Sequence, residues 1–236
     1  MKTKQVYYES PYLKSLTGKV IGVEEKGNLF NVILDQTIFY PEGGGQPSDR
    51  GVLSSKNWSA KVLYVHTIDG EIIHQISPDG EIKINDAMES GLDWNWRYKY
   101  MKIHSAGHLV HDTLMTMIKG LKPIRGSHGK KAFLEYEGNI EASLKGDLEK
   151  NANDAINKNL PIITKEATYD ELAKECQFVL PNLPKDKILR MIKIGDYPAM
   201  PDGGVHVKST KEIGKIWIIN LTPEEGKVII RYGVSG

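Results

Sequence analysis

The residue pattern of the chain changes near residue 90, and this change constrains the fold more than any other feature. Before it, short apolar or alternating runs at residues 19–23, 29–34, 60–65, 71–76 and 81–84 are separated by Gly, Asn, Asp and Pro. Such runs between turn-forming residues predict a small all-β barrel. A longer pattern with apolar residues at helical spacing begins around Trp94. We therefore expect two domains, residues 1–90 and residues 91–236.

The second part of the chain combines helical and strand patterns. Residues 141–159 carry apolar side chains on one helical face, and Thr168 followed by Glu171 has the spacing of a capping box at a helix start. Strands are predicted at residues 132–136, 188–194, 215–219 and 227–232. The simplest arrangement of these elements is a set of helices packed on an antiparallel sheet, so we expect an α+β fold.

Composition excludes several classes of protein. The 236 residues contain one cysteine, Cys176, which rules out an intramolecular disulfide and a four-cysteine zinc site. No apolar run approaches the roughly 18 to 20 residues of a membrane-spanning helix, so we expect a cytoplasmic protein that binds no membrane. The net charge of +1 argues against non-specific coating of nucleic acid, and we expect no DNA binding.

Charge is nevertheless divided unevenly along the chain. Residues 1–90 hold 9 basic and 12 acidic side chains, whereas residues 91–236 hold 22 basic and 18 acidic ones. A surface that faces a polyanion is therefore expected on the second domain. Nothing in the sequence indicates the oligomeric state.

Two histidines four residues apart stand out in the predicted helix. His104 and His108 project from one helical face, so both imidazoles can reach one metal ion. Taken alone, the pair is equally compatible with two hydrogen-bonded histidines in a protein core. A second segment favours the metal, because Asp202 and His206 flank Gly203 and Gly204 in a predicted tight turn. Three imidazoles and a carboxylate form a complete ligand set for zinc.

A run of three glycines is the second unusual motif. Gly43, Gly44 and Gly45 add no side chain to a core and cost conformational entropy, so they indicate backbone that closely approaches another group. An ordinary flexible hairpin is the alternative interpretation. The polar residues Thr37 and Gln46 on either side favour the wall of a site.

Several motifs in order make the chain similar to a known family. They are residues 35–51, including the run from Thr37 to Gln46, then residues 93–97, His104-Ser105-Ala106-Gly107-His108, Gly126-Ser127-His128, residues 157–162 and residues 203–214. With these motifs the chain resembles the free-standing alanyl-tRNA editing proteins, AlaX, in their medium-length form, which are related to the editing domain of alanyl-tRNA synthetase. The resemblance covers nearly the whole chain.

The resemblance implies a fold and an activity. The first domain would be a barrel like those of translation factors, and the second an α+β editing domain that binds one zinc ion. The implied activity is ATP-independent hydrolysis, in trans, of the ester that joins a wrong amino acid to alanine tRNA. The substrate would be Ser-tRNA(Ala), with Gly-tRNA(Ala) as a second candidate, and Ala-tRNA(Ala) would be spared. The alternatives are a non-catalytic tRNA-binding module of the same fold and an editing enzyme for another mischarged tRNA.

One position departs from the family pattern. The family usually has a cysteine where this chain has Asp202, and a threonine where it has Val205. Asp202 either ligates zinc as a harder anion or orients a water molecule beside a site formed by His104, His108 and His206.

The remaining assignments concern the substrate. An alanine pocket rejects serine only modestly, so an editing site needs a polar group that requires the serine hydroxyl. On the resemblance, Thr37 and Gln46 are the candidates for that group, with Asp202 as a third catalytic residue and Gly43, Gly44 and Gly45 as substrate contacts. Candidate contacts of the tRNA acceptor end are Arg97, Lys130 and Lys131, because basic side chains hold the phosphates of single strands.

Overall fold

The computed structural model describes residues 2–179 and 183–235, which form two compact units. The first unit comprises residues 1–43 and 47–99, and the second comprises residues 44–46 and 100–236. The short segment Gly44–Gln46 therefore belongs with the second unit although it lies within the first part of the sequence. The predicted division into domains near residue 90 stays a prediction.

The first unit is a closed antiparallel barrel with the strand order β2-β3-β7-β6-β5-β8. Its strands are β2 (Ser15–Lys26), β3 (Leu29–Leu34), β5 (Gly51–Ser54), β6 (Ser59–Ile68), β7 (Glu71–Asp79) and β8 (Ala87–Leu92). Side chains that alternate along these strands fill the interior, among them Val20, Val32, Leu53, Val65 and Ile76. A short helix α1 (Val6–Glu9) and the parallel pair β1 (Lys4–Gln5) and β4 (Gln36–Thr37) complete the unit.

Turn chemistry explains where the barrel strands reverse. Asp69 and Gly70 join β6 to β7, and both have positive φ, at 50° and 82°. This is the Asp-Gly hairpin turn whose twist matches that of the strands. Four of the five predicted strands lie within β2, β3, β6 and β7. The expected strand at residues 81–84 is wrong, because the chain turns there before β8, and β5 was not predicted.

The second unit is built on helix α2 (Trp94–Met117), whose residues from Tyr100 onward belong to it. A four-stranded antiparallel sheet has the order β14-β15-β10-β9 and consists of β14 (Lys215–Glu224), β15 (Lys227–Ser235), β10 (Phe133–Glu137) and β9 (Lys122–Ser127). A smaller sheet has the order β11-β12-β13 and consists of β11 (Ile162–Ala167), β12 (Leu189–Ile194) and β13 (Met200–Pro201). The predicted α+β class is confirmed.

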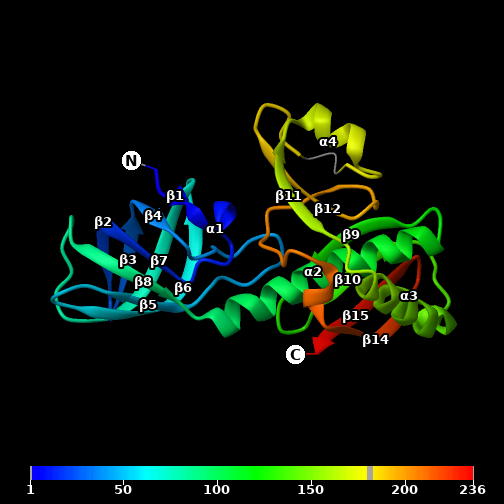
Figure 1. Ribbon diagram of the computed structural model, residues 1–236, viewed down its shortest axis with the longest axis horizontal. Coiled ribbons are helices and arrows are strands. Elements are labelled where there is room, and N and C mark those ends of the chain that lie inside the picture. Colours follow the sequence, from blue (N-terminus) through cyan, green and yellow to red (C-terminus); the bar gives the residue numbers. More distant parts are fainter. Residues whose placement is uncertain (1, 180–182, 236) are drawn as a thin grey trace. The chain divides into compact units, whose positions relative to one another are not determined.

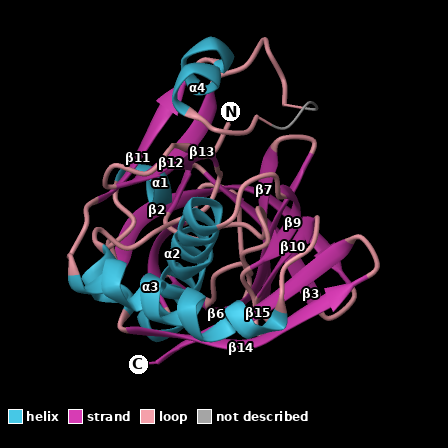
Figure 2. Cartoon of the chain, turned by 90° about the vertical axis from the view of Figure 1, so that its right-hand side faces the viewer, coloured by secondary structure: helices cyan, strands magenta, loops and turns pink. Residues whose placement is uncertain are grey.

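Within the second unit, α2 lies between the two sheets. In Figure 1 and in the rotated view of Figure 2, β11, β12 and helix α4 (Tyr169–Glu175) lie on one side of α2, and β14 and β15 lie on the other. Helix α3 (Lys145–Asn157), preceded by the 3-10 turn Ala142–Leu144, packs Leu148, Ala152 and Ala155 into the core.

Short sequence motifs determine where some elements of the second unit begin. The predicted capping box is present, since Thr168 accepts a hydrogen bond from the Glu171 N–H and the Glu171 carboxylate accepts one from the Thr168 N–H. A second 3-10 turn, Thr210–Ile213, leads into β14. Over the part of the chain that the structure describes, no helix has the length and apolar character to span a membrane.

Candidate metal centre

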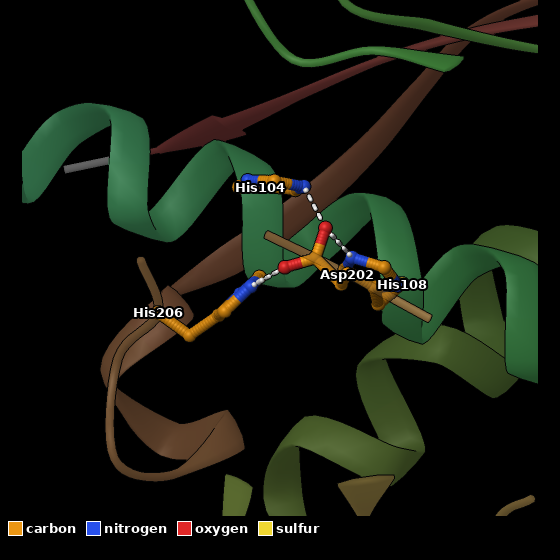
Figure 3. Close-up of side chains that lie close together, drawn as sticks. All are labelled: His104, His108, Asp202 and His206. Atoms are coloured by element: carbon orange, nitrogen blue, oxygen red, sulfur yellow. Dashed lines mark hydrogen bonds and ion pairs between the residues drawn. The ribbon is translucent and has the colours of Figure 1, made fainter. Parts of the chain in front are cut away.

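Four side chains from two segments of the second unit converge on one point. His104 and His108 lie one turn apart on α2, while Asp202 and His206 lie in the loop that follows β13. One potential ligand atom from each lies within 4.8 Å of the other three. Figure 3 shows the Asp202 carboxylate between the three imidazoles. The predicted grouping of these four residues is therefore present in the fold.

Two distances between the potential ligand atoms match the spacing around a tetrahedral ion. Asp202 Oδ1 lies 3.2 Å from His104 Nε2 and 3.4 Å from His108 Nε2. A metal bound at about 2.0 to 2.1 Å holds tetrahedral ligand atoms about 3.3 Å apart. The other carboxylate oxygen, Oδ2, lies 2.7 Å from His206 Nε2 and accepts a hydrogen bond from the Gly204 N–H at 2.6 Å. Oδ1 is thus placed as a ligand atom, and Oδ2 holds the loop.

Burial leaves these groups in the protonation states that bind a metal. Burial lowers the pKa of His104, and it lowers the pKa of His206 to about 3, so both rings are neutral near pH 7. Burial alone would raise the pKa of Asp202, but His104 and His206 hold it well below its usual range. Among the residues that the structure describes, no hydrogen bond reaches the buried Nε2 atoms of His104 and His108. A cation at this point would satisfy both of them, so the residues fit a metal ion.

Gln46 fixes the tautomer of His104. The Val205 N–H, which can only donate, points to Gln46 Oε1 at 3.3 Å, so this atom is the amide oxygen. His104 Nδ1 lies 2.8 Å from the same oxygen and must donate to it. The His104 proton therefore sits on Nδ1, and Nε2 presents its lone pair to the centre of the cluster.

The other histidines also have partners on their outer nitrogens. His206 Nδ1 lies 3.1 Å from Ser105 Oγ, which also accepts the Val207 N–H. His108 Nδ1 lies 3.5 Å from Met200 Sδ. Contacts of this kind on the outer nitrogen fix the orientation of a metal-binding imidazole.

Two glycines permit the close packing around the cluster. A Cβ at Gly204 would collide with Cε1 and Nδ1 of the His104 ring. Gly45 has φ of +76°, and a Cβ there would lie 2.8 Å from the Gly126 oxygen and 3.2 Å from the His128 ring. The Gly45 carbonyl accepts a hydrogen bond from the His128 N–H at 2.7 Å. The expected close approach of the glycine run thus occurs against β9, and it delivers Gln46 to His104.

A cavity of about 160 Å³ adjoins the cluster. His108 lies in its wall, as do His111 and Asp112 from the next turn of α2. Most of the remaining lining is apolar and comes from β9, β10 and the segments around residues 177–178 and 198–201, with Met115, Ile124, Leu134, Phe178, Ala199 and Met200 among its members. The cavity therefore leads from a metal ligand into a largely apolar space.

Thr37 belongs to the first unit, whereas the four ligands belong to the second. It is fully buried, and its Oγ1 lies 2.8 Å from His74 Nε2 and accepts the Phe39 N–H at 3.0 Å. His74 Nδ1 faces the Val32 carbonyl at 3.1 Å, so this nitrogen carries the ring proton and Nε2 accepts the Thr37 hydroxyl proton. The only proton of the Thr37 hydroxyl is thus already used inside the barrel unit.

The predicted tRNA contacts lie in different environments. Arg97 is fully buried, and its guanidinium binds the Asp49 carboxylate and the carbonyls of Pro11 and Ile38. It holds the first unit together and has no face left for a phosphate, which corrects the expectation of a tRNA contact. Lys130 and Lys131 are exposed in the turn between β9 and β10, and their contact with tRNA stays a prediction. Gly43 accepts a hydrogen bond from the Tyr40 hydroxyl at 3.0 Å, and Gly44 has φ of +54°.

Several site residues were not predicted from the sequence. The ring of His128 stacks on that of His104 with centroids 4.0 Å apart, and its Nδ1 bonds the Tyr232 hydroxyl at 2.6 Å. Asp112 follows His108 by four residues, so the same helical spacing that identified the histidine pair also places Asp112 on that face. No spacing rule could have found Ser105 or Met200, because their roles depend on the loop that meets α2.

Two family models match the chain. The model described as class II (A) tRNA synthetases matches residues 4–96. The model described as the second additional domain of threonyl and alanyl tRNA synthetases matches residues 189–231, which include Asp202 and His206.

Similar proteins extend the match over the whole chain. The alanyl-tRNA editing protein AlaX-M of Saccharolobus solfataricus is 32% identical over 99% of both chains. AlaX-M of Pyrococcus horikoshii is 32% identical over 91% of this chain and 89% of its own. AlaX-L of Pyrococcus horikoshii is 36% identical over 92% of this chain, which spans about half (54%) of that longer protein. The chain therefore belongs to the family of alanyl-tRNA editing proteins.

Proposed function

We propose that this protein hydrolyses the ester of mischarged Ser-tRNA(Ala), and more weakly of Gly-tRNA(Ala), at a zinc site formed by His104, His108, Asp202 and His206. The observation that carries the proposal is the convergence of three imidazoles and a carboxylate beside a cavity, in a chain of the alanyl-tRNA editing family. Nitrogen and oxygen ligands in a four-coordinate arrangement suit zinc better than magnesium or calcium.

Gln46 has two roles in this proposal. Its oxygen orients His104, as described above. Its Nε2 is buried, and among the described residues no hydrogen bond reaches it. A buried amide donor without a partner is costly unless a ligand accepts from it, so we assign Nε2 to an oxygen of the bound aminoacyl ester.

Asp202 acts as an anionic ligand in this scheme, with the Gly204 N–H holding its second oxygen. Ser105 keeps His206 turned toward Asp202. A bound zinc ion would supply Lewis-acid polarisation of the ester or a more acidic water. The protein's own groups orient the ligands and present a preformed donor to the substrate.

The tRNA would lie over the turn between β9 and β10. A shallow pocket of about 360 Å³ lies there, and none of its lining residues is acidic. Its lining consists of Lys130, Lys131, Ala132, Ile219, Arg231 and Tyr232. Arg231 also lies over the ring of Phe133, 5.8 Å from its centroid. Cations next to aromatic rings are the usual means of holding RNA strands.

A deacylation assay tests the proposed activity. The zinc-loaded protein should hydrolyse Ser-tRNA(Ala) fastest, Gly-tRNA(Ala) more slowly and Ala-tRNA(Ala) hardly at all, and chelator should abolish the activity until zinc is restored. His104→Ala and His206→Ala should lose both bound zinc and activity. Full metal content and full rate in both variants would refute the site. Binding of tRNA without hydrolysis would indicate a non-catalytic module, and hydrolysis of a mischarged non-alanine tRNA alone would indicate another editing substrate.

The same assay tests Thr37. We retain it as a candidate specificity residue, now as a hydrogen-bond acceptor, because His74 uses its proton. Thr37→Val should lower Ser/Ala discrimination, and Thr37→Ser, which keeps the hydroxyl, should not. Unchanged discrimination in a correctly folded Thr37→Val protein would confine Thr37 to the barrel core.

Salt dependence tests the RNA surface. Binding affinity for RNA falls as the salt concentration rises. The slope of log affinity against log salt concentration becomes less steep by about one for each phosphate contact that is lost. The double variant Lys130→Ala/Lys131→Ala should bind tRNA(Ala) more weakly, and the magnitude of its salt-dependence slope should be smaller by about two. Lys158→Ala, at the exposed end of α3, is the control and should leave the slope unchanged. An unchanged slope in the double variant would remove these lysines from the interface.

A further inference from the structure

Asp112 is a buried acid that the proposed chemistry leaves unused. It lies on α2 one turn beyond His108, and only 6% of it is exposed. Among the residues that the structure describes, no hydrogen bond or ion pair reaches its carboxylate, and burial raises its pKa well above the ordinary value. A buried carboxyl group without a partner is destabilising, so its presence calls for a ligand.

The surroundings of Asp112 define what such a ligand must be. Asp112 lines the cavity that begins at His108, and most of the remaining wall is apolar. Two other titratable groups of the wall already have partners, since His111 Nδ1 lies 3.0 Å from the Tyr136 hydroxyl and His128 Nδ1 lies 2.6 Å from the Tyr232 hydroxyl. The Arg125 guanidinium in the wall is bound to Glu135 at 2.5 Å. Within the described residues, Asp112 and the exposed Gln177 are thus polar side chains of this wall without a hydrogen-bond partner, and Asp112 is the buried one of the two.

The size of the cavity matches an aminoacyl group. Its volume is about 160 Å³. A cavity of about 150 Å³ holds benzene, with about six non-hydrogen atoms, as many as a seryl group has. A seryl group whose ester lies at the metal cluster would direct its side chain along α2 toward the next turn, where Asp112 lies.

We propose that Asp112 reads the side-chain hydroxyl of serine in this cavity, in addition to any contribution of Thr37, an inference that rests on the editing function proposed above. The serine hydroxyl donates a hydrogen bond to the Asp112 carboxyl group and satisfies it. Alanine places a methyl group there and leaves the carboxyl group unsatisfied, so it is rejected. Glycine does not reach Asp112, which ranks it below serine. The cavity thereby supplies the preference for serine that an alanine-sized apolar pocket lacks.

Deacylation rates test this assignment directly. In Asp112→Ala, the ratio of the Ser-tRNA(Ala) rate to the Ala-tRNA(Ala) rate should fall at least tenfold, while the Gly-tRNA(Ala) rate stays within about twofold of the original protein. Asp112→Asn, which keeps an acceptor, should retain most of the discrimination. Asp147→Ala, an exposed aspartate of α3, is the matched control and should change nothing.

Binding of small probes provides a readout that does not depend on catalysis. L-serinamide, L-alaninamide and glycinamide carry the same ammonium and carbonyl groups and differ only in the side chain. In NMR titrations of the zinc-loaded protein, Asp112→Ala should lose the preference for L-serinamide over L-alaninamide. The metal content of Asp112→Ala should be unchanged. Its melting temperature should be unchanged or higher, because an unpaired buried acid has been removed.

The outcomes separate this inference from the proposed function. If the unmodified protein fails to deacylate Ser-tRNA(Ala), the editing function itself is wrong. If it is active and Asp112→Ala keeps the full serine preference in both assays, Asp112 does not read the hydroxyl. An equal loss for the seryl, alanyl and glycyl substrates would also overturn the inference, because Asp112 would then bind the common ammonium group.

Discussion

At the scale of single residues, the site depends on which nitrogen of each imidazole carries the proton. The Val205 N–H determines which Gln46 atom is the oxygen, and that oxygen determines the tautomer of His104. A glutamine with no direct place in the ligand set therefore prepares one of the ligands. In the proposed function the same side chain offers its amide N–H groups to the substrate, and these two roles can be separated experimentally.

Substitutions at Gln46 should separate metal binding from catalysis. Gln46→Leu removes the acceptor for His104, and zinc affinity should fall about 10- to 100-fold, the usual effect of losing such a partner. Gln46→Glu keeps an acceptor but loses the donor, so it should bind zinc as well as the original protein and still deacylate at least tenfold more slowly. Competition with a chromophoric chelator measures the first property, and single-turnover deacylation measures the second. Equal zinc affinity in all three proteins would contradict the tautomer argument.

His74 makes the stability of the barrel sensitive to acid. Burial lowers its pKa from 6.5 to about 4, so the folded barrel keeps it neutral while the unfolded chain is protonated below 6.5. The stabilisation is complete above pH 6.5 and is lost as the pH falls toward 4. At about pH 4.5 this loss amounts to roughly 2 to 3 kcal/mol.

The test compares the original protein with His74→Gln. Urea unfolding should be measured near pH 7 and at about pH 4.5. The drop in the free energy of unfolding between these two pH values should be larger in the original protein than in His74→Gln by roughly 2 to 3 kcal/mol. Tryptophan fluorescence reports mainly on the first unit, which contains Trp58, Trp94 and Trp96. Parallel pH profiles would show that His74 does not titrate as described.

At the scale of elements, a rigid helix and a glycine-containing loop complete the centre together. The loop can approach α2 only because Gly204 lacks a Cβ where the His104 ring lies. Neither element holds a full ligand set by itself. The position of the loop relative to α2 is therefore as important as the identity of the ligands.

Gly204→Ala should displace the loop or the ring. The added methyl group overlaps the His104 imidazole, and overpacking of this kind costs about 1 to 3 kcal/mol. We expect a lower melting temperature and at least tenfold weaker zinc binding. Gly146→Ala is the control, because nothing lies within 4 Å of a Cβ there and the residue is helical, so that variant should be neutral or slightly more stable. Unchanged zinc affinity in Gly204→Ala would mean that the loop adapts freely.

At the scale of the whole molecule, the metal centre belongs to one compact unit. All four ligands and the supporting residues Gln46, Ser105 and Met200 lie in the second unit, including the short segment contributed by residues 44–46. Binding to the folded state alone stabilises it by mass action. Metal binding should therefore stabilise the second unit and leave the barrel strands unaffected.

Hydrogen exchange with and without zinc tests this localisation. At a free zinc concentration about 100 times the dissociation constant, amides of α2 and β15 should gain about 2.7 kcal/mol of protection, and those of β3 and β7 should gain none. His206→Ala should show no gain in either unit. Equal protection of both units would indicate that they unfold as one cooperative body.

Local patterns determined much of this protein in advance. Turn residues and alternation predicted four barrel strands, the helical period predicted α2 and α3, and Thr168 and Glu171 predicted the start of α4. The four-residue spacing of His104 and His108 and the turn between Asp202 and His206 predicted the cluster of potential metal ligands that the fold brings together. These features depend on neighbours in the chain, so the sequence by itself contains the information needed to find them.

Only the tertiary structure decided which distant groups meet. It placed Gln46 on His104, Ser105 on His206 and Arg97 inside the barrel unit, and it left Asp112 beside the cavity without a hydrogen-bond partner among the described residues. These roles depend on burial and on partners that are tens of residues away in the sequence. Contacts of this kind change the chemistry of a side chain but produce no repeating pattern in the sequence from which they could be predicted. The cluster of potential ligands was therefore predictable from spacing, whereas the protonation and orientation of its side chains became defined only when the loop after β13 and residues 44–46 packed against α2.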